Sequence, residues 1–121
     1  AVENNEIDGG KGIFVSGSNN IIRNNRIDDC SMGMYIWGLS NSTIVSNQIN
    51  STGYGFYIVH NSNNNTIQNN VLSGNGKHTG ILLHKSGDND VISNTVANFT
   101  AGISAGGDNC SITFNRIENC G

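Results

Sequence analysis

An asparagine recurs about every 22 residues along this chain, each time between the same aliphatic neighbours. In the clearest case Ile22 lies three residues before Asn25, and Ile27 lies two residues after it. The six positions of the series are Asn5, Asn25, Asn47, Asn70, Asn94 and Asn115. A fixed period of this length is typical of solenoids, in which each repeat forms one coil. We therefore predict a structural ladder, in which stacked asparagine amides bond to one another along the axis.

A second repeated element lies half a period away, where a glycine opens a segment of alternating apolar residues, as in Gly33–Ile36. Alternation with a period of two predicts β-strands. Each such strand is followed by a polar turn, which holds Asn19, Asn41, Asn64, Asp88 or Asn109. One repeat cannot bury its own apolar face, so successive repeats must stack. The prediction is an all-β parallel β-helix of about five coils, with 21–25 residues per coil, forming a single domain over residues 1–121.

Stacking predicts one shared core with two sets of aliphatic columns. The strand after each glycine supplies Ile13, Val15, Met34, Ile36, Phe56, Ile58, Ile81, Leu83, Ile103 and Ala105. The positions that flank the ladder supply Ile22, Ile27, Ile44, Ile49, Ile67, Leu72, Val91, Val96, Ile112 and Ile117.

The composition limits the classes of function. Charged residues make up 12% of the chain and the net charge is −3, which excludes a basic surface for nucleic acid. No apolar run reaches the roughly 18 residues of a membrane span, and no signal peptide opens the chain. Because the sequence starts and stops inside a repeat, we expect a segment of a longer array or a subunit that stacks on other copies.

Three cysteines and one long repeat leave alternatives open. Cys30, Cys110 and Cys120 have neither zinc-site spacing nor an even count, so they are small buried side chains or include a Cys110–Cys120 disulfide. The longest repeat has its extra residues at Ser73–Thr79, which predicts a protruding loop. That loop is either a tolerated insertion or a functional loop that carries Lys77 and His78.

Alternation also predicts an apolar outward face on the strand after the glycine. Its side chains include Phe14, Tyr35, Trp37, Tyr57 and His84. A contiguous exposed apolar surface usually marks an interface or a binding groove. Three interpretations remain: contact with another chain, contact with a carbohydrate, or ring stacking within the coils.

Carboxylates and histidines supply the remaining candidates. Asp8 and Asp28 should stack on adjacent coils, where like charges repel unless a cation intervenes, so they are weak candidates for calcium. A second carboxylate group, Asp88, Asp90 and Asp108, fits solvated turns. His60 and Lys85 should lie near His84 on adjacent coils, as a general base or a polyanion contact. No paired carboxylate accompanies them, so we predict no catalytic residue, no cofactor and no other metal.

Five asparagine sequons also fall in turns or at turn edges, where glycosylation is sterically allowed. They begin at Asn41, Asn50, Asn64, Asn98 and Asn109.

The run from Gly55 to Leu72, with its glycine-opened strand, asparagine turn and Asn69-Asn70 bracket, resembles the right-handed parallel β-helix repeats of the NosD-like group and of the wider class of carbohydrate-binding proteins and sugar hydrolases. The resemblance covers essentially the whole chain and implies the fold. The catalytic motifs of that class are missing: Tyr54-Gly55 lacks the Asp-Pro-His continuation of the epimerases, and Asp28-Asp29 stands without the other pectinase motifs.

Two functions follow as expectations. The first is a non-catalytic structural module at the cell surface or in the periplasm, which self-associates through its coil ends or its aromatic face and assembles end to end as a fibre. The alternative is a carbohydrate-binding or polysaccharide-processing β-helix domain that uses the outward aromatic residues.

Overall fold

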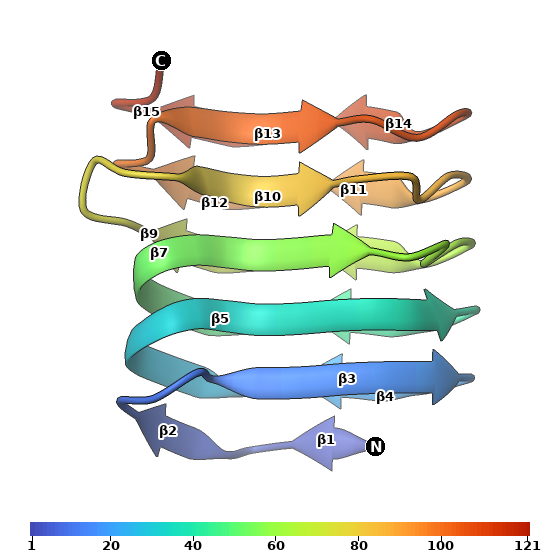
Figure 1. Cartoon of the computed structure of the whole chain (residues 1–121), viewed down its shortest axis with the longest axis horizontal. Helices are drawn as coiled ribbons and strands as arrows, with labels where there is room; N and C mark the ends of the chain where they lie inside the picture. Colours follow the sequence, from blue (N-terminus) through green and yellow to red (C-terminus); the bar gives the residue numbers. More distant parts are fainter.

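Short parallel strands stacked coil upon coil build the whole chain, as Figure 1 shows. The computed structural model describes residues 1–121, except for the side chain of Thr52. The described residues form about five turns and contain no helix. The prediction of an all-β parallel β-helix is therefore confirmed.

Strand pairing divides each coil into three sides. One side consists of β1 (Val2–Glu3), β4 (Ile21–Arg23), β6 (Thr43–Val45), β8 (Thr66–Gln68), β11 (Asp90–Ile92) and β14 (Ser111–Thr113). The second contains β2 (Glu6–Asp8), β9 (Val71–Ser73), β12 (Thr95–Ala97) and β15 (Arg116–Glu118). The third contains β3 (Ile13–Ser18), β10 (Thr79–Leu83) and β13 (Ala101–Ala105). The long strands β5 (Arg26–Ser40) and β7 (Gln48–Val59) turn a corner and belong to both the second and the third sides.

The core lies inside these three sides, because the register places aliphatic side chains directly above one another. Ile22, for example, pairs with Val2 on one coil and with Ile44 on the next. Sixteen of the twenty predicted core positions are buried. The structure adds Cys30, Leu39 and Phe99, which fill the corners of the coil and are also buried.

The core prediction is wrong for the coil that ends the stack. There Ile112 and Ile117 are 43% and 44% exposed, Ile103 is half-buried and Ala105 is exposed. The strands β13, β14 and β15 each pair with a described strand on one side only. Burial of a β-helix side chain requires a coil above as well as below, and the periodicity of the sequence cannot report this.

The asparagine ladder is a continuous chain of hydrogen bonds. The Oδ1 of Asn70 accepts from both the backbone N–H and the Nδ2 of Asn47, at 2.9 and 3.0 Å. Its own Nδ2 donates to the carbonyl of Ile44 at 3.0 Å and to the Oδ1 of Asn94 at 3.0 Å. The same double acceptance links Asn5 to Asn25, Asn25 to Asn47, and Asn94 to Asn115.

A second ladder, which the sequence analysis missed, runs along another corner. The backbone N–H of Ser42 donates to Asn65 Oδ1, and that of Asn65 donates to Asn89 Oδ1, both at 3.0 Å. In both ladders the preceding residue has a left-handed backbone, for example Asn64 with φ 60° and Asn69 with φ 55°. Asparagine tolerates this conformation better than most residues. One local motif, a left-handed residue followed by an amide or hydroxyl side chain, therefore makes both corners.

Glycine lies at the corner where the chain enters the third side, because the next coil leaves no space there for a side chain. A Cβ on Gly55 would lie 2.4 Å from the carbonyl oxygen of Gly80 and 2.4 Å from Leu72 Cδ2. Gly33 and Gly80 have the same restriction. Close approach of the backbones therefore excludes a side chain at this corner, and β5 and β7 run continuously through Gly33 and Gly55.

Removing one buried rung should cost far more than removing an exposed one. We expect Asn70→Ala to lower the free energy of unfolding by about 3 kcal/mol, because it leaves the N–H of Asn47 buried without its acceptor and removes the amide's bonds to the carbonyl of Ile44 and to Asn94. The matched control Asn5→Ala should cost about 1 kcal/mol or less, because Asn5 is exposed and only donates to the ladder. Urea denaturation measures both; equal costs would show that the ladder does not stabilise the stack.

Candidate functional site

Seven aromatic rings form one connected surface on the outer side of β3, β5 and β7, which we call the aromatic face. Its members are Phe14, Tyr35, Trp37, Tyr54, Tyr57, His60 and His78. The chain has three tyrosines and one tryptophan, and all four lie here. Such concentration of the aromatic residues that also carry a polar group is typical of binding surfaces.

The strand register explains the centre of the aromatic face. Phe14 pairs with Tyr35 and Tyr35 with Tyr57, so the three side chains form one outward column across three coils. Ring centroids of Phe14 and Tyr35 are 5.1 Å apart with an angle of 11° between the planes, and those of Tyr35 and Tyr57 are 5.4 Å apart. Trp37 stacks on His60 with centroids 3.3 Å apart.

Much of the aromatic face remains open to solvent despite this stacking. Phe14 is 64% exposed and Trp37 is 41% exposed, whereas Tyr35 and Tyr57 are half-buried. The hydroxyls of the three tyrosines make no hydrogen bond to any described residue. The rings therefore cover part of one another's apolar surface. Ring edges, hydroxyls and the large side chains of Phe14 and Trp37 stay exposed to solvent.

The sequence located only part of this surface. It gave Phe14, Tyr35, Trp37 and Tyr57 by alternation, but it missed Tyr54, which lies where β7 turns the corner. Tyr54 packs edge-on against Tyr57 at 4.8 Å and contacts His78 at 4.8 Å. A strict period of two cannot follow a strand around a bend, and this is why the corner residue was not found.

The loop at Ser73–Thr79 extends from the stack between β9 and β10, as Figure 1 shows. Its backbone is bonded to the next coil: Gly76 N–H donates to the carbonyl of Asn98 at 2.6 Å, and Thr100 N–H donates to the carbonyl of His78 at 2.9 Å. These bonds hold the His78 ring against Tyr54.

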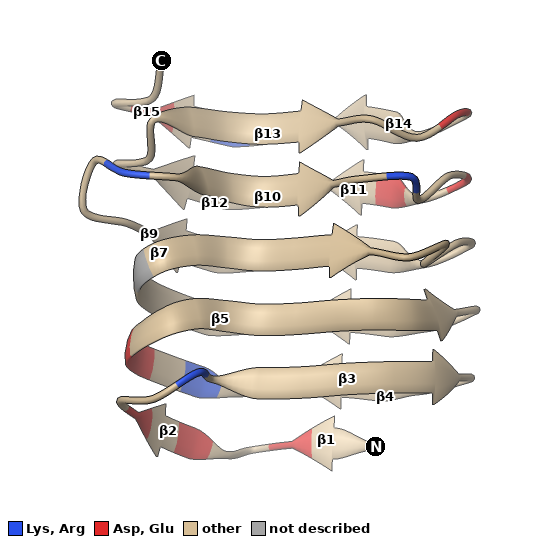
Figure 2. Ribbon diagram, viewed as in Figure 1, with Lys and Arg blue, Asp and Glu red and all other residues tan. Residues whose placement is uncertain are grey.

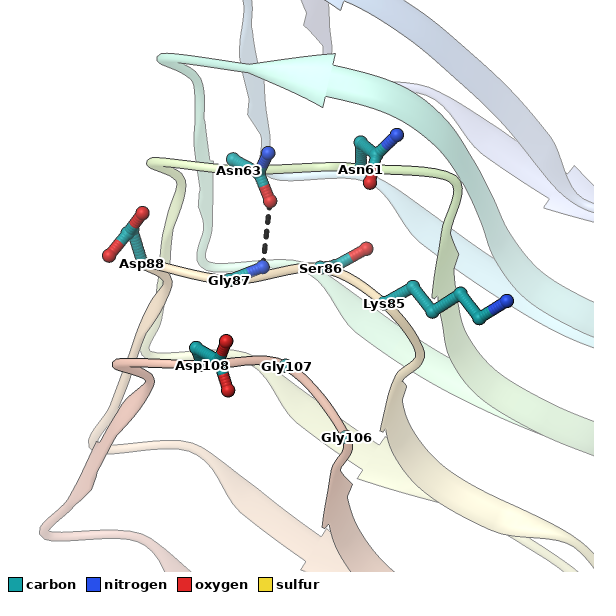
Figure 3. Close-up of a pocket in the computed structure, with 9 residues that line it drawn as sticks. All are labelled: Asn61, Asn63, Lys85, Ser86, Gly87, Asp88, Gly106, Gly107 and Asp108. Atoms are coloured by element: carbon teal, nitrogen blue, oxygen red, sulfur yellow. Dashed lines mark hydrogen bonds between the residues drawn. The ribbon is translucent and has the colours of Figure 1, made fainter.

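Three hollows adjoin the aromatic face and share lining residues. An apolar hollow of about 340 Å³ is lined by Lys11, Gly12, Phe14, Ser31, Met32 and Tyr35. A basic hollow of about 240 Å³ is lined by Tyr35, Tyr57, Val59, His60, Asn61, His84 and Lys85. A turn hollow of about 490 Å³, drawn in Figure 3, is lined by Asn61, Asn63, Lys85, Ser86, Gly87, Asp88, Gly106, Gly107 and Asp108. Tyr35 lines both of the first two hollows, and Asn61 and Lys85 line both of the last two. We call these three adjacent hollows the groove.

The strands beneath this groove carry no charge. Figure 2 shows β3, β10, β13 and the outward part of β5 without acidic or basic residues, and it shows basic residues just beyond the ends of β3 and β10. Lys11 precedes β3, and Lys85 follows β10. The apolar and basic hollows thus have one lysine each and no carboxylate, whereas the turn hollow is lined by Asp88 and Asp108 as well as by Lys85.

The stacked carboxylates Asp8 and Asp28 are paired across adjacent strands, as expected. Arg26 lies beside them, with its Nε 2.9 Å from Asp28 Oδ2, and Asn50 Nδ2 donates to Asp28 Oδ1 at 2.9 Å. The hydrogen bond from Asn50 and that from Arg26 hold the pKa of Asp28 below its ordinary value. The guanidinium of Arg26 therefore compensates the negative charge of Asp28, one of the two weak candidates for a calcium ligand.

The other candidates are dispersed. Asp88 and Asp108 line the turn hollow, whereas Asp90 lies on β11. Across the described residues, no three His, Cys, Asp or Glu side chains form a group that could hold a metal ion. Cys110 and Cys120 form no disulfide, so the alternative of a Cys110–Cys120 disulfide is wrong. Burial raises the pKa of the Cys30 thiol.

The five sequon asparagines Asn41, Asn50, Asn64, Asn98 and Asn109 are all exposed. The Thr52 side chain, which completes the sequon at Asn50, lies outside the described residues. Four of the five, Asn41, Asn64, Asn98 and Asn109, have a left-handed backbone. Their glycosylation stays a prediction.

The stacked parallel coils and the ladders define a β-helix repeat protein. The chain belongs to the NosD family, described as periplasmic copper-binding proteins, whose match covers residues 1–121. No curated protein and no solved structure matches the chain. The family agrees with the predicted location in the periplasm or outside the cell. No described helix is long and apolar enough to cross a membrane.

The copper in the family description can be compared with the donors present here. His60 and His84 line one hollow, but no third histidine, cysteine or carboxylate joins them in a metal-binding group of described residues. The side chains of this chain therefore do not fit a copper centre with three such protein ligands.

Removing the Asn50 amide should raise the pKa of Asp28. In Asn50→Ala the carboxylate loses the larger of its two stabilising hydrogen bonds, so we expect its titration to move upward toward the ordinary aspartate value. Because the folded-state pKa is lowered, the associated stability is present above the ordinary pKa and is lost as the pH falls through the folded value. Carboxyl NMR titration measures the shift; an unchanged titration would remove Asn50 as the cause.

Proposed function

We propose that this protein is a non-catalytic β-helix module that works outside the cytoplasm and binds a carbohydrate chain on its aromatic face. The single observation that carries the proposal is the gathering of every tyrosine and the one tryptophan on one uncharged side of the stack. Structural columns of rings would be equally well made by phenylalanine. The tyrosine hydroxyls and the indole N–H add hydrogen-bonding groups that a purely structural column does not need.

The groove supports the same proposal. Sugars present apolar C–H faces and many hydroxyls, so their sites combine aromatic rings with amides and hydroxyls. Here Tyr35 and Tyr57 are followed along the groove by Asn61 and then by Asn63. Asn63 Oδ1 accepts from the backbone N–H of Gly87 at 2.7 Å, which orients that amide (Figure 3).

Replacing the tryptophan should weaken carbohydrate retention. We expect Trp37→Ala to lower affinity for a retained polysaccharide by about tenfold, because an exposed aromatic contact contributes roughly 0.5 to 1.5 kcal/mol. The matched control is Phe114→Ala, since Phe114 is 88% exposed but lies beside β14, on another side of the coil. Affinity electrophoresis over a panel of polysaccharides measures both. Absence of retention on any of them, or equal losses in both variants, would contradict the proposal.

A second candidate function is end-to-end assembly. It is supported by the outer side of the last coil, where Ile112, Ile117 and Phe114 are exposed and the Asn115 backbone N–H has no described partner. A further coil, later in the same protein or in a second copy, would bury these side chains and continue the ladder. Assembly is the case in which a second copy supplies that coil.

Charging that surface separates the two functions. We expect Ile117→Lys to abolish any long polymers of the wild-type chain, because a buried unpaired charge opposes stacking. Size-exclusion chromatography with electron microscopy gives the size distribution. A wild-type chain that stays monomeric at high concentration would contradict assembly and leave carbohydrate binding as the function.

A further inference from the structure

We infer that the ligand of the aromatic face is an anionic glycan, a polymer of sugars bearing carboxylate or sulfate groups, with one anionic group held at His60, His84 and Lys85. This inference rests on the proposed function and names its ligand class. It comes from the charges that line the groove and from where the lysine points.

The apolar and basic hollows contain no carboxylate. Their charged lining residues are Lys11 and Lys85, and the basic hollow adds two histidines. This is unexpected in a chain with nine acidic and six basic residues and a net charge of −3. A low-charge surface with only positive groups at its edges favours a negatively charged ligand.

Lys85 makes no ion pair with a described residue. The three ion pairs in the structure use Arg23, Arg26 and Arg116. The nearest carboxylates in the groove are those of Asp88 and Asp108, in the turn hollow. Figure 3 shows the Lys85 side chain extending away from both of them. Its ammonium is therefore available to an anion in the basic hollow.

The backbone at this turn gives a separate argument. After Trp37 the turn uses Gly38, with φ 58°, which costs glycine nothing. At the corresponding turns the chain places His60, with φ 58°, and Lys85, with φ 49°. Large side chains in a left-handed conformation are unfavourable, so glycine would suit these two turns better than the histidine and lysine that the chain has there.

The two histidines complete the basic hollow. The stack of His60 on Trp37 fixes its imidazole beside the groove, while His84 is exposed at the end of β10. Asn61 supplies an amide between them and the turn hollow. Donors from Lys85 and the imidazoles would meet the oxygens of one carboxylate or sulfate.

The groove also indicates a polymer rather than a single sugar. The apolar and basic hollows, of about 340 and 240 Å³, join at Tyr35 and have one lysine each. Successive sugars could therefore lie on Phe14, Tyr35 and Tyr57 while their charged groups reach both lysines.

The test uses the one tryptophan, whose fluorescence reports binding at Trp37. The intact chain is titrated with an oligouronate and with the same oligomer after reduction of its carboxyls, and then with a sulfated oligosaccharide and its desulfated form. We expect the oligomer that carries the preferred anionic group to bind about tenfold more tightly than its neutral counterpart, which is the gain from one charge-assisted hydrogen bond. The stronger of the two pairs assigns carboxylate or sulfate.

Lys85→Gln should lower the affinity for the anionic oligosaccharide about tenfold and leave the affinity for its neutral counterpart unchanged. Arg116→Gln removes the same charge on another side and should have no effect, because its exposed ion pair contributes little. Lys85→Gly should lose the anion preference with an unchanged or raised melting temperature, since glycine suits the left-handed backbone.

Four outcomes decide the matter. Preference for the anionic glycans that depends on Lys85 supports the inference. Equal binding of charged and neutral forms, with no effect of Lys85→Gln, overturns it but leaves carbohydrate binding in place. No binding of any oligosaccharide contradicts both. Equal binding of a single-stranded oligonucleotide of matched charge also overturns it, because the site would then be a general polyanion contact.

Discussion

One side-chain amide per coil holds this structure in register. Each ladder asparagine after Asn5 has an Oδ1 that accepts two hydrogen bonds from the preceding coil, while its Nδ2 donates to a backbone carbonyl of that same coil. Corner backbone groups that a turn would leave unpaired inside the protein are thereby satisfied. Because a buried unpaired group costs about 1 to 3 kcal/mol, the ladder allows sharp corners around an apolar core. Across the described residues, no buried side-chain nitrogen or oxygen lacks a partner.

The ladder requires a left-handed residue immediately before each asparagine, and that requirement shapes the composition. Asn, Ser and Asp fill most of these positions, and glycine is needed where neighbouring backbones touch. The inward side chains are then fixed as aliphatic. Outward positions on the strands remain free of structural constraint, so aromatic residues gathered there call for another explanation. Their location on a single side of the stack is the basis of the proposed function.

The fold could be predicted from the sequence because its repeat is regular. Period, alternation and turn residues gave the coils, the ladder and sixteen core positions, including Ile22 and Leu72. Three features of the structure were not predicted from the sequence. The exposure of Ile112 depends on a neighbouring coil, the contact of Tyr54 depends on a bend in β7, and the second ladder uses Ser42 in place of asparagine. The second ladder did leave one signal in the sequence: Ser42, Asn65 and Asn89 are each preceded by Asn or Asp, which tolerate a left-handed backbone.

The NosD family match establishes the scaffold over the whole length. The central claim is that the aromatic face binds an anionic glycan. Its most direct measurement is a two-dimensional NMR titration with the oligouronate or the sulfated oligosaccharide, whichever binds more tightly, following every backbone amide and the Trp37 indole. The account predicts shifts confined to the groove from Lys11 through Tyr35 to Lys85, with the ladder amides unmoved. Shifts on the side formed by β4, β6 and β8, or none at saturating ligand, would contradict it.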